Sequence, residues 1–463
     1  MFIGRHQELN ELERLYKTDE FQCVIMYGRR RVGKTALINE FIQGKDAIYY
    51  VGQETNSNEN LESLSSSIIL HSQIFNEFSP VFSNFKDALE AVFSMSTKRR
   101  IVLAIDEYPY LAASYKGISS LLQNCIDKYK RTSKLYLILC GSSLSFMEHQ
   151  VLGYKSPLYG RRTAQFKIMP FEYSQTREYF PDSYNAGDVA LLYGITGGIP
   201  LYLSIIDRQY SVVENIKQHF LKTSGYLFEE PGNLIKQECR EPAKYNAIIK
   251  AIANGASRLS EISVKVGMET AMCSTYISKL MSIGIIRKEH PFREETGKKT
   301  IYRINDNMFR FWYRFIPDTM SLIQRGEIEL AYSHIQPGIA GFMGAVFEEI
   351  CLQYLWKLNS NGQTPFSFTD AGRWWGNDPI NRKECEIDVI ADNKEDAIFA
   401  ECKWTNEPVK SSILDDLIQK SALFRYSRKY YYIFSKNGFS EGILKKSCQT
   451  DNVTLVSFED INI

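Results

Sequence analysis

Short apolar runs alternate with amphipathic stretches over the first third of the chain. Runs at residues 24–26, 47–51, 101–105 and 135–140 have the length of buried strands, and the stretches between them have helical spacing. Parallel strands that are covered on both faces read as continuous apolar runs. The pattern therefore predicts an α/β domain with a parallel sheet over residues 1–170.

A purely helical pattern follows this domain. No strand-like run occurs between residues 171 and 240, and helical spacing is found at 186–193, 200–206 and 211–222. We expect residues 171–240 to form a helical lid attached to the sheet domain.

Residues 241–306 have the order helix, helix, helix and two short strands. The helical candidates lie at 244–253, 258–265 and 270–282, and the strands lie near Ile286 and Ile301. This order is typical of a winged helix, an elaboration of the helix-turn-helix. A helical connector is expected over residues 307–337.

The last part of the chain, residues 338–463, predicts a second α/β unit. It begins with a long helix at 341–358 and has a second helix at 411–423. The predicted strands lie near 384–391, 396–404, 430–434 and 453–457.

Composition sets limits on the class of protein. The 463 residues are enough for two to four domains, and Lys plus Arg number 55 against 54 for Asp plus Glu. The chain as a whole therefore has no cationic field, and a nucleic-acid partner must be argued locally. The longest uninterrupted apolar run has about six residues, the amino terminus is charged, and nine cysteines occur without a C-x-x-C pair. We expect no membrane-spanning helix, no secretory signal, reduced thiols and a cytoplasmic location.

The strongest motif is GRRRVGKT at residues 28–35, which matches G-x-x-x-x-G-K-[ST] between a predicted strand and a predicted helix. Gly28 and Gly33 let backbone N–H groups curl around a phosphate, Lys34 reaches the β and γ oxygens, and Thr35 offers its hydroxyl to Mg²⁺. The motif predicts that the chain binds ATP with Mg²⁺.

A second element follows the strand at 101–105. Asp106 is expected to bind the metal through its water shell, and Glu107 is expected to orient and deprotonate the attacking water. Ser142 follows the next strand and is placed either near the γ-phosphate or in an ordinary turn at the end of the strand.

With these two elements the chain resembles the archaeal-type P-loop ATPases of the AAA+/STAND division. The resemblance also rests on FIGR at residues 2–5 with Glu8, on GSS at 141–143, on SPLYGRR at 156–162 and on GGIPLY at 197–202. It implies that Gly4 and Arg5 lie against the adenine. It also implies that Gly198 and Pro200 of the lid approach the nucleotide.

Two arginines in the SPLYGRR segment are candidates for the phosphate site. Arg161 or Arg162 is expected to neutralise charge on the γ-phosphate as an arginine finger. The alternative is a surface arginine pair held by carboxylates of the lid.

The winged helix has little capacity to read a base sequence. Its third helix, at 270–279, carries one lysine and no arginine, whereas the wing at 287–303 has six basic residues against three acidic ones. This composition favours weak, non-specific DNA contact through phosphates over sequence-specific regulation. The alternative is a rigid spacer that packs on the lid.

Two acids and a lysine converge on a predicted hairpin near the carboxy terminus. A turn at 392–395 sets Asp388 opposite residues 399–401, while Glu401 and Lys403 project from the same face. Paired carboxylates can hold Mg²⁺ or Mn²⁺, and the lysine can stabilise developing charge.

This constellation resembles the PD-(D/E)xK nuclease fold, and the larger match is to the carboxy-terminal domain that often follows archaeal-type ATPases. The resemblance implies that Glu348, on the preceding helix, is a further acidic metal ligand. Ile387 stands where the usual proline precedes the first acid.

We therefore expect an ATP-hydrolysing switch protein coupled to a metal-dependent DNA nuclease. The alternative is a regulatory protein whose nuclease-like domain is inactive. That domain would then serve docking or assembly, with a second copy of the chain or with another protein.

Overall fold

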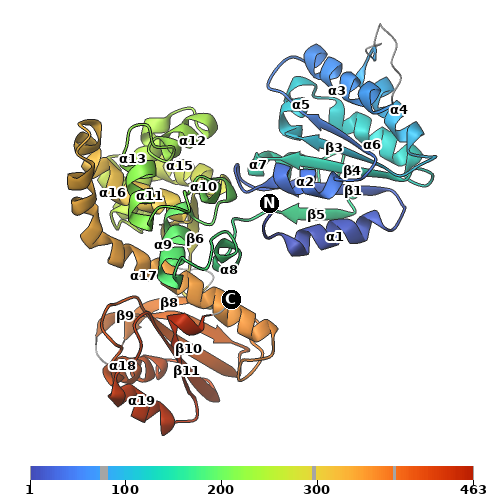
Figure 1. Cartoon of the computed structure of the whole chain (residues 1–463). Coiled ribbons are helices and arrows are strands. Elements are labelled where there is room, and N and C mark those ends of the chain that lie inside the picture. Colours follow the sequence, from blue (N-terminus) through green and yellow to red (C-terminus); the bar gives the residue numbers. More distant parts are fainter. Residues whose placement is uncertain (1, 73–81, 295–298, 379–381, 462–463) are drawn as a thin grey trace. The chain divides into compact units, whose positions relative to one another are not determined.

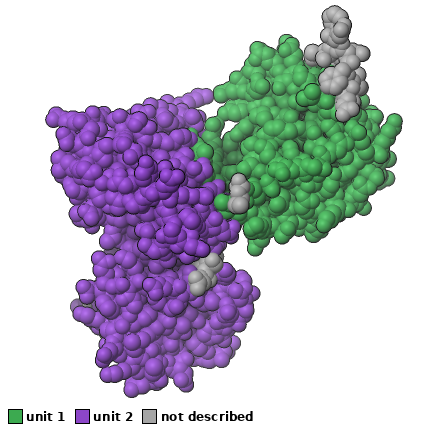
Figure 2. All heavy atoms as spheres, viewed as in Figure 1, with its two compact units in different colours: residues 1–170, 199–201 green, residues 171–198, 202–463 purple. Residues whose placement is uncertain are grey.

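The computed structural model describes residues 2–72, 82–294, 299–378 and 382–461. The chain forms two compact units (Figure 2). Unit 1 comprises residues 1–170 and 199–201, and unit 2 comprises residues 171–198 and 202–463.

Unit 1 contains a five-stranded parallel sheet in the order β2-β3-β4-β1-β5 (Figure 1). This sheet confirms the predicted α/β class, although the edge strand β5 was not predicted. The strands are β1 (Gln22–Tyr27), β2 (Ala47–Val51), β3 (Ile101–Asp106), β4 (Leu135–Gly141) and β5 (Ala164–Lys167).

Alternate side chains of each strand enter two separate cores. Val24 and Met26 pack with α1 and α2 on one face, whereas Cys23 and Ile25 pack with α3 to α6 on the other. Burial on both faces explains why β1, β3 and β4 are apolar along most of their length, with Gln22 at the start of β1 and Asp106 at the end of β3. The first face carries α1 (His6–Tyr16) and α2 (Lys34–Ile42), and the second carries α3 (Ser57–Ser72), α4 (Phe85–Met95), α5 (Tyr108–Ser114) and α6 (Ile118–Tyr129). Two short helices follow β4, namely α7 (Leu144–Phe146) and the π-helix η1 (Met147–Val151).

Residues 171–282 are helical throughout, apart from connecting loops, and an antiparallel pair of strands follows. The first helices are α8 (Tyr173–Arg177), α9 (Ala186–Thr196), α10 (Pro200–Ser204), α11 (Val212–Phe220) and α12 (Glu230–Glu238). The next are α13 (Pro242–Ala253), α14 (Leu259–Val266) and α15 (Thr270–Ser282), and the strands are β6 (Ile286–Glu289) and β7 (Ile301–Ile304).

Two long helices come next, α16 (Asn307–Gln324) and α17 (Ile328–Ser360). Pro317 lies inside α16. The two helices pack together, and Phe311 of α16 meets Phe342 of α17 at 5.4 Å between ring centroids. Burial of this aromatic face outweighs the hydrogen bond that a proline removes, about 3 kcal/mol. The predicted boundary between residues 337 and 338 falls inside α17.

The carboxy-terminal sheet is mixed, in the order β12-β11-β10-β9-β8. Helix α17 covers one face of it, and α18 and α19 pack on the other. The strands are β8 (Asp370–Asp378), β9 (Lys383–Asp392), β10 (Asp396–Lys403), β11 (Arg428–Ser435) and β12 (Val453–Ser457). The remaining helices are α18 (Ser411–Ser421), α19 (Glu441–Cys448) and the 3₁₀ turn η2 (Phe458–Asp460). Strand β8 was not predicted.

One helix in the described part of the chain, α17, is long and apolar enough to cross a membrane by length and composition. The sequence prediction considered only uninterrupted apolar runs, so it did not identify α17 as a candidate membrane span. In the structure α17 packs against α9, α16 and β10 of its own unit.

Candidate functional site

The strand order of unit 1 brings three sequence motifs to one sheet edge. The loop 28–33 follows β1, Asp106 ends β3, and Ser142 follows β4, which lies between β1 and β3. Carboxyl ends of parallel strands meet at the same edge. The predicted nucleotide site is therefore formed from adjacent strands.

The loop itself depends on its glycines. A Cβ at Gly28 would lie 2.3 Å from the carbonyl oxygen of Ile168, and Gly33 has φ +88° at the N-cap of α2. Lys34 is buried, and its Nζ donates to the carbonyls of Gly28 and Arg29, each at 2.9 Å. Burial lowers the pKa of Lys34. The loop thus holds an ammonium group at the place where the motif requires one.

Thr35 and Asp106 are in direct contact. The Thr35 hydroxyl donates to Asp106 Oδ2 at 2.6 Å, and the Tyr49 hydroxyl donates to the same oxygen at 3.0 Å. A hydroxyl and a carboxylate are the oxygen ligands that Mg²⁺ takes, so this pair fits the implied cation. Tyr49 was not identified from the sequence, although β2 pairs with β3 and sets Tyr49 beside Ala104.

Glu107 is held in an unusual backbone conformation. It has φ 48°, caps α5, and its N–H donates to Asp106 Oδ1 at 2.9 Å. The Ser142 hydroxyl donates to Glu107 Oε2 at 2.8 Å. Ser142 therefore orients the carboxylate that the sequence identifies as the base.

Arg5 ties the amino terminus to the phosphate loop. Its guanidinium is buried, donates to the carbonyl of Val32 at 3.1 Å and to that of Met169, and pairs with Glu8 at 3.1 Å. Gly4 and Arg5 both have positive φ, 67° and 60°. The guanidinium is thus bound to backbone of the same unit, and its predicted contact with adenine is untested.

The GGIPLY segment is also held in place. In unit 1, Pro200 Cγ lies 3.6 Å from where a Cβ of Gly33 would be, so this proline lies beside the phosphate loop. In unit 2, Gly198 has φ +64°, and a Cβ there would lie 2.1 Å from the carbonyl oxygen of Phe171. Only glycine fits at that position.

The structure does not bring Arg161 to the phosphate loop of its own chain. Arg161 Nη2 pairs with Asp127 Oδ2 at 2.6 Å, and the next residue but one, Thr163, bonds to Cys23 near the start of β1. The phosphate loop follows the other end of β1. The prediction of an arginine finger is therefore wrong for Arg161 acting within unit 1. Its carboxylate partner, Asp127, lies in α6 and not in the lid that the alternative named. Arg162, beside it, is exposed.

In unit 2 the hairpin of β9 and β10 brings Asp388, Glu401 and Lys403 together. Ala400 pairs with Val389, and the N–H of Cys402 donates to Asp388 Oδ2 at 2.8 Å. Lys403 Nζ lies 2.5 Å from Glu401 Oε1, and Lys420 Nζ of α18 lies 3.8 Å from Glu401 Oε2. Burial raises the pKa of Asp388 to about 7, with further contributions from Glu401 and Glu348.

A β-bulge shapes this site. Gly372 pairs with Ile390 and Trp374 with Ile387, so Arg373 of β8 stands opposite both Asp388 and Val389 of β9. Bulges redirect side chains next to functional sites. Here the bulge lies beside Asp388. Besides burial, the charges of Glu401 on β10 and Glu348 on α17 both raise the pKa of the Asp388 carboxyl.

The predicted three-carboxylate metal site is not assembled. Within residues 2–72, 82–294, 299–378 and 382–461, no three His, Cys, Asp or Glu side chains are close enough to hold one metal ion. Glu348 instead lines a cavity with Arg303, Arg310 and Arg373. The positive charges of these arginines act on the Glu348 carboxylate. Glu348 therefore does not have the role of a metal ligand that the resemblance implied. Asp388 and Glu401 remain as a pair of oxygen donors that fit a divalent cation.

Two family models match separate parts of the chain. Residues 2–206 match a family described as an ATPase domain predominantly from Archaea, which identifies the P-loop region as an ATPase domain. Residues 312–414 match a family described as archaeal and bacterial proteins of unknown function.

Similar proteins are found in Archaea. The solved Walker-type ATPase PABY2304 of Pyrococcus abyssi shares the fold with a TM-score of 0.50 and 20% identity, over 68% of this chain and 96% of that one. An ATP-binding protein of Methanocaldococcus jannaschii, MJ0423, is 49% identical over 45 residues, which cover 10% of this chain and 76% of the relative. The MJECL04 protein of the same organism is 33% identical over 444 residues, which cover 94% of this chain and 96% of the relative. The chain belongs to the same family as MJECL04, with an archaeal-type ATPase domain at its amino-terminal end.

Proposed function

We propose that the protein is an ATP-hydrolysing switch that acts through Lys34, Thr35, Asp106, Glu107 and Ser142. The observation that carries the proposal is the 2.6 Å bond from Thr35 to Asp106 beside a Glu107 carboxylate held by Ser142. Phosphoryl transfer to water requires a glycine-rich loop, a hydroxyl, a metal-binding acid and a base.

Each residue has a distinct role in this mechanism. Lys34 exchanges its two carbonyl acceptors for phosphate oxygens and supplies positive charge where negative charge develops. Thr35 and Asp106 would hold Mg²⁺, which would neutralise negative charge on the phosphates. Glu107 Oε1 or Oε2 accepts the proton of the attacking water, with the carboxylate oriented by Ser142.

The variant Glu107→Gln tests this assignment. It should bind a fluorescent ATP analogue with Mg²⁺ as the wild type does, and its phosphate release should fall by about two orders of magnitude, because only the proton acceptor is lost. Glu148→Gln, a substitution at a surface ion pair of the same unit, is the control and should hydrolyse normally. Equal turnover by the wild type and Glu107→Gln would reject the role of the base.

A second candidate function is metal-dependent cleavage of nucleic acid at Asp388, Glu401 and Lys403. Its support is the raised pKa of Asp388, the buried Glu401 Oε2 without a hydrogen-bond partner among the described residues, and the lysine beside Glu401. Perturbed carboxylates next to a lysine are typical of functional sites. In this function Asp388 and Glu401 hold Mg²⁺ or Mn²⁺, and Lys403 stabilises charge on the phosphate.

Incubation of the full chain with plasmid and single-stranded DNA tests cleavage. Mg²⁺, Mn²⁺ and ATP are each added and omitted, and Asp388→Asn is compared with the wild type. Metal-dependent cutting that the variant lacks supports a nuclease. If every DNA form stays intact under all conditions, the domain is a docking or assembly module.

The helices α13 to α15 with β6 and β7 are proposed to act as a winged helix. Helix α15 carries Lys279 and no arginine, so this module is suited to phosphate contacts and not to a base code. We propose DNA as a non-specific partner on this ground, with binding that weakens as salt increases.

A further inference from the structure

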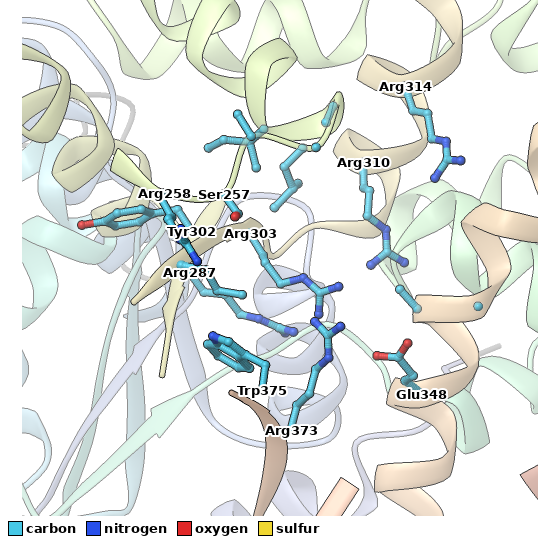
Figure 3. Close-up of a pocket in the computed structure, with 18 of the residues that line it drawn as sticks. Ser257, Arg258, Arg287, Tyr302, Arg303, Arg310, Arg314, Glu348, Arg373 and Trp375 are labelled. Carbon is cyan, nitrogen blue, oxygen red and sulfur yellow. The ribbon is translucent and has the colours of Figure 1, made fainter. Parts of the chain in front are cut away.

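A cavity of about 750 Å³ is lined by residues of unit 2. Four arginines enter it from four different elements, and we call the cavity the arginine pocket (Figure 3). They are Arg287 of β6, Arg303 of β7, Arg310 of α16 and Arg373 of β8. Figure 3 shows their guanidinium groups pointing toward one another, with the Glu348 carboxylate of α17 facing them.

The carboxylates in the neighbourhood satisfy these arginines only in part. Arg373 pairs with Glu386, and Arg287 Nη2 lies 2.5 Å from Glu289 Oε1. Arg303 Nη1 is 3.6 Å from Glu289 Oε2, beyond hydrogen-bond distance. Among the described lining residues, six arginines face four glutamates, an excess of two positive charges.

Arg310 is the least satisfied member. Its Nε and Nη2 are buried and have no hydrogen-bond partner among the described residues, and the same holds for Arg373 Nε. A buried donor without an acceptor is destabilising, and more so when the group is charged. Burial also lowers the pKa of Arg310 to about 10; Glu349 opposes this shift, and Arg303 and Arg287 add to it. The site therefore has charged donors that lack an acceptor.

Phosphate is the anion that this arrangement suits. Guanidinium forks bind phosphate oxygens in pairs, and four forks around one space can satisfy several oxygens at once. Trp375 stands beside Arg373 on the wall, with its indole partly exposed, and offers a flat surface to a base. A cavity of this volume accommodates a nucleotide unit but not a duplex.

We propose that the arginine pocket binds the phosphate of a nucleotide unit, either a free nucleotide or the end of a nucleic-acid strand. A smaller cavity of about 290 Å³ is lined by the same four arginines together with Glu348 and Asp388. A strand end held in the pocket therefore lies next to Asp388. Binding does not depend on cleavage, whereas presentation of the strand to Asp388 rests on the second candidate function.

The test measures binding by the full chain in the Lys34→Ala background, so that the phosphate loop contributes little, and in EDTA, so that no strand is cut. The probe is a fluorescent 12-nucleotide single strand with a 5′-phosphate, and the same strand with a 5′-hydroxyl is its partner probe. AMP and ATP are competitors. If AMP or ATP displaces the labelled strand as effectively as the unlabelled phosphorylated strand does, the ligand is a free nucleotide. If only the unlabelled strand displaces it, the ligand is a strand end.

Arg310→Gln and Arg303→Gln should each weaken binding of the phosphorylated strand by about ten-fold or more. Each should also reduce the slope of log affinity against log salt by about one. Arg325→Gln, at the carboxyl end of the same helix α16 and outside the pocket, is the matched control and should bind normally. Arg310→Lys keeps the charge and should recover part of the affinity.

Thermal unfolding of each variant checks that the fold is intact, and Arg303→Gln serves if Arg310→Gln unfolds. The proposal would be overturned if Arg310→Gln and Arg303→Gln bound every probe as tightly as the Arg325→Gln control does. It would also be overturned if the Lys34→Ala protein that carries no pocket substitution did not bind the probes. Loss of binding in the pocket variants supports it even when no DNA is ever cleaved. The outcome thus separates the pocket from the proposed nuclease.

Discussion

Buried polar side chains at the phosphate loop of unit 1 are bonded to protein groups that a ligand can replace. Lys34 donates to two carbonyls of its own loop, and Thr35 donates to Asp106. These bonds offset the cost of burying the groups, because a buried polar atom without a partner is expensive. Binding of a nucleotide then exchanges partners at the site and does not require new burial.

Ser142→Ala should lower the rate of ATP hydrolysis without changing nucleotide affinity. The hydroxyl bonds only Glu107 Oε2 among the partners described for it, so its loss frees the carboxylate to turn. We expect a drop in kcat of about ten-fold, measured by phosphate release, with an unchanged dissociation constant for an ATP analogue. A weaker affinity would mean that Ser142 contacts the nucleotide itself.

Asp388 should make stability fall as pH rises. Its pKa is raised from 3.8 to about 7 in the folded protein, so the folded state holds the proton more tightly than the unfolded chain. Stability is then greatest below pH 4 with respect to this group and declines as the pH rises toward 7. Asp388→Asn cannot ionise and removes the decline.

The unfolding temperature of Asp388→Asn minus that of the wild type should therefore increase between pH 5 and pH 8, by about 2–4 °C. Scanning calorimetry at four pH values measures it. A difference that stays constant across this range would show that the carboxyl titrates normally.

At the scale of elements, the phosphate loop is coupled to the edge strand that the sequence prediction missed. The N–H of Ile168, just after β5, donates to the carbonyl of Tyr27 at 2.7 Å, and the Ile168 carbonyl lies against Gly28. Gly28→Ala should therefore push the loop away from β5. We expect loss of ATP binding, measured by analogue fluorescence, and a lower unfolding temperature.

Gly44→Ala is the control for this substitution. Gly44 has φ +70° but nothing within 4 Å of a new Cβ. The alanine there should cost some stability through backbone strain and leave ATP binding intact. Normal binding by Gly28→Ala would contradict the proposed contact.

Local patterns predicted the sheet of unit 1 and the nucleotide motifs because those signals are contiguous in sequence. Gly28 to Thr35 form one motif, and the rule on parallel strands brings Asp106 to it. Strand β5 has alternating exposure over four residues, and β8 contains Asp370 and Gly372, so neither has the apolar run of a central strand. Pairing with β1 and β9 makes them strands.

The sequence could not predict which charged side chains from distant parts of the chain meet in the fold. Glu348 was correctly placed on a helix, but the arginines that face it come from β7, α16 and β8. Arg161 belongs to a segment whose sequence does not indicate beside which end of β1 the segment lies. Tyr49 lies on the neighbouring strand and has no motif of its own.

At the scale of the whole molecule, the two units have separate cores and should unfold separately. ATP with Mg²⁺ at 100 times its dissociation constant stabilises the binding unit by about 2.7 kcal/mol. We expect calorimetry to show two transitions, of which one moves upward with the nucleotide. The shift should be absent in Lys34→Ala. A single transition that shifts as a whole would mean that the units unfold together.

Helix α17 also constrains how this chain could exchange parts with others. It packs on α16 and α9 and also on strands β9 and β10 of the carboxy-terminal sheet, within one continuous helix of 33 residues. A gene fusion that joined a different carboxy-terminal domain at residue 338 would cut the helix and expose apolar surface on both products. Recombination within this family should therefore retain α17 with the sheet it covers, and a designed chimera should place its junction before Ile328.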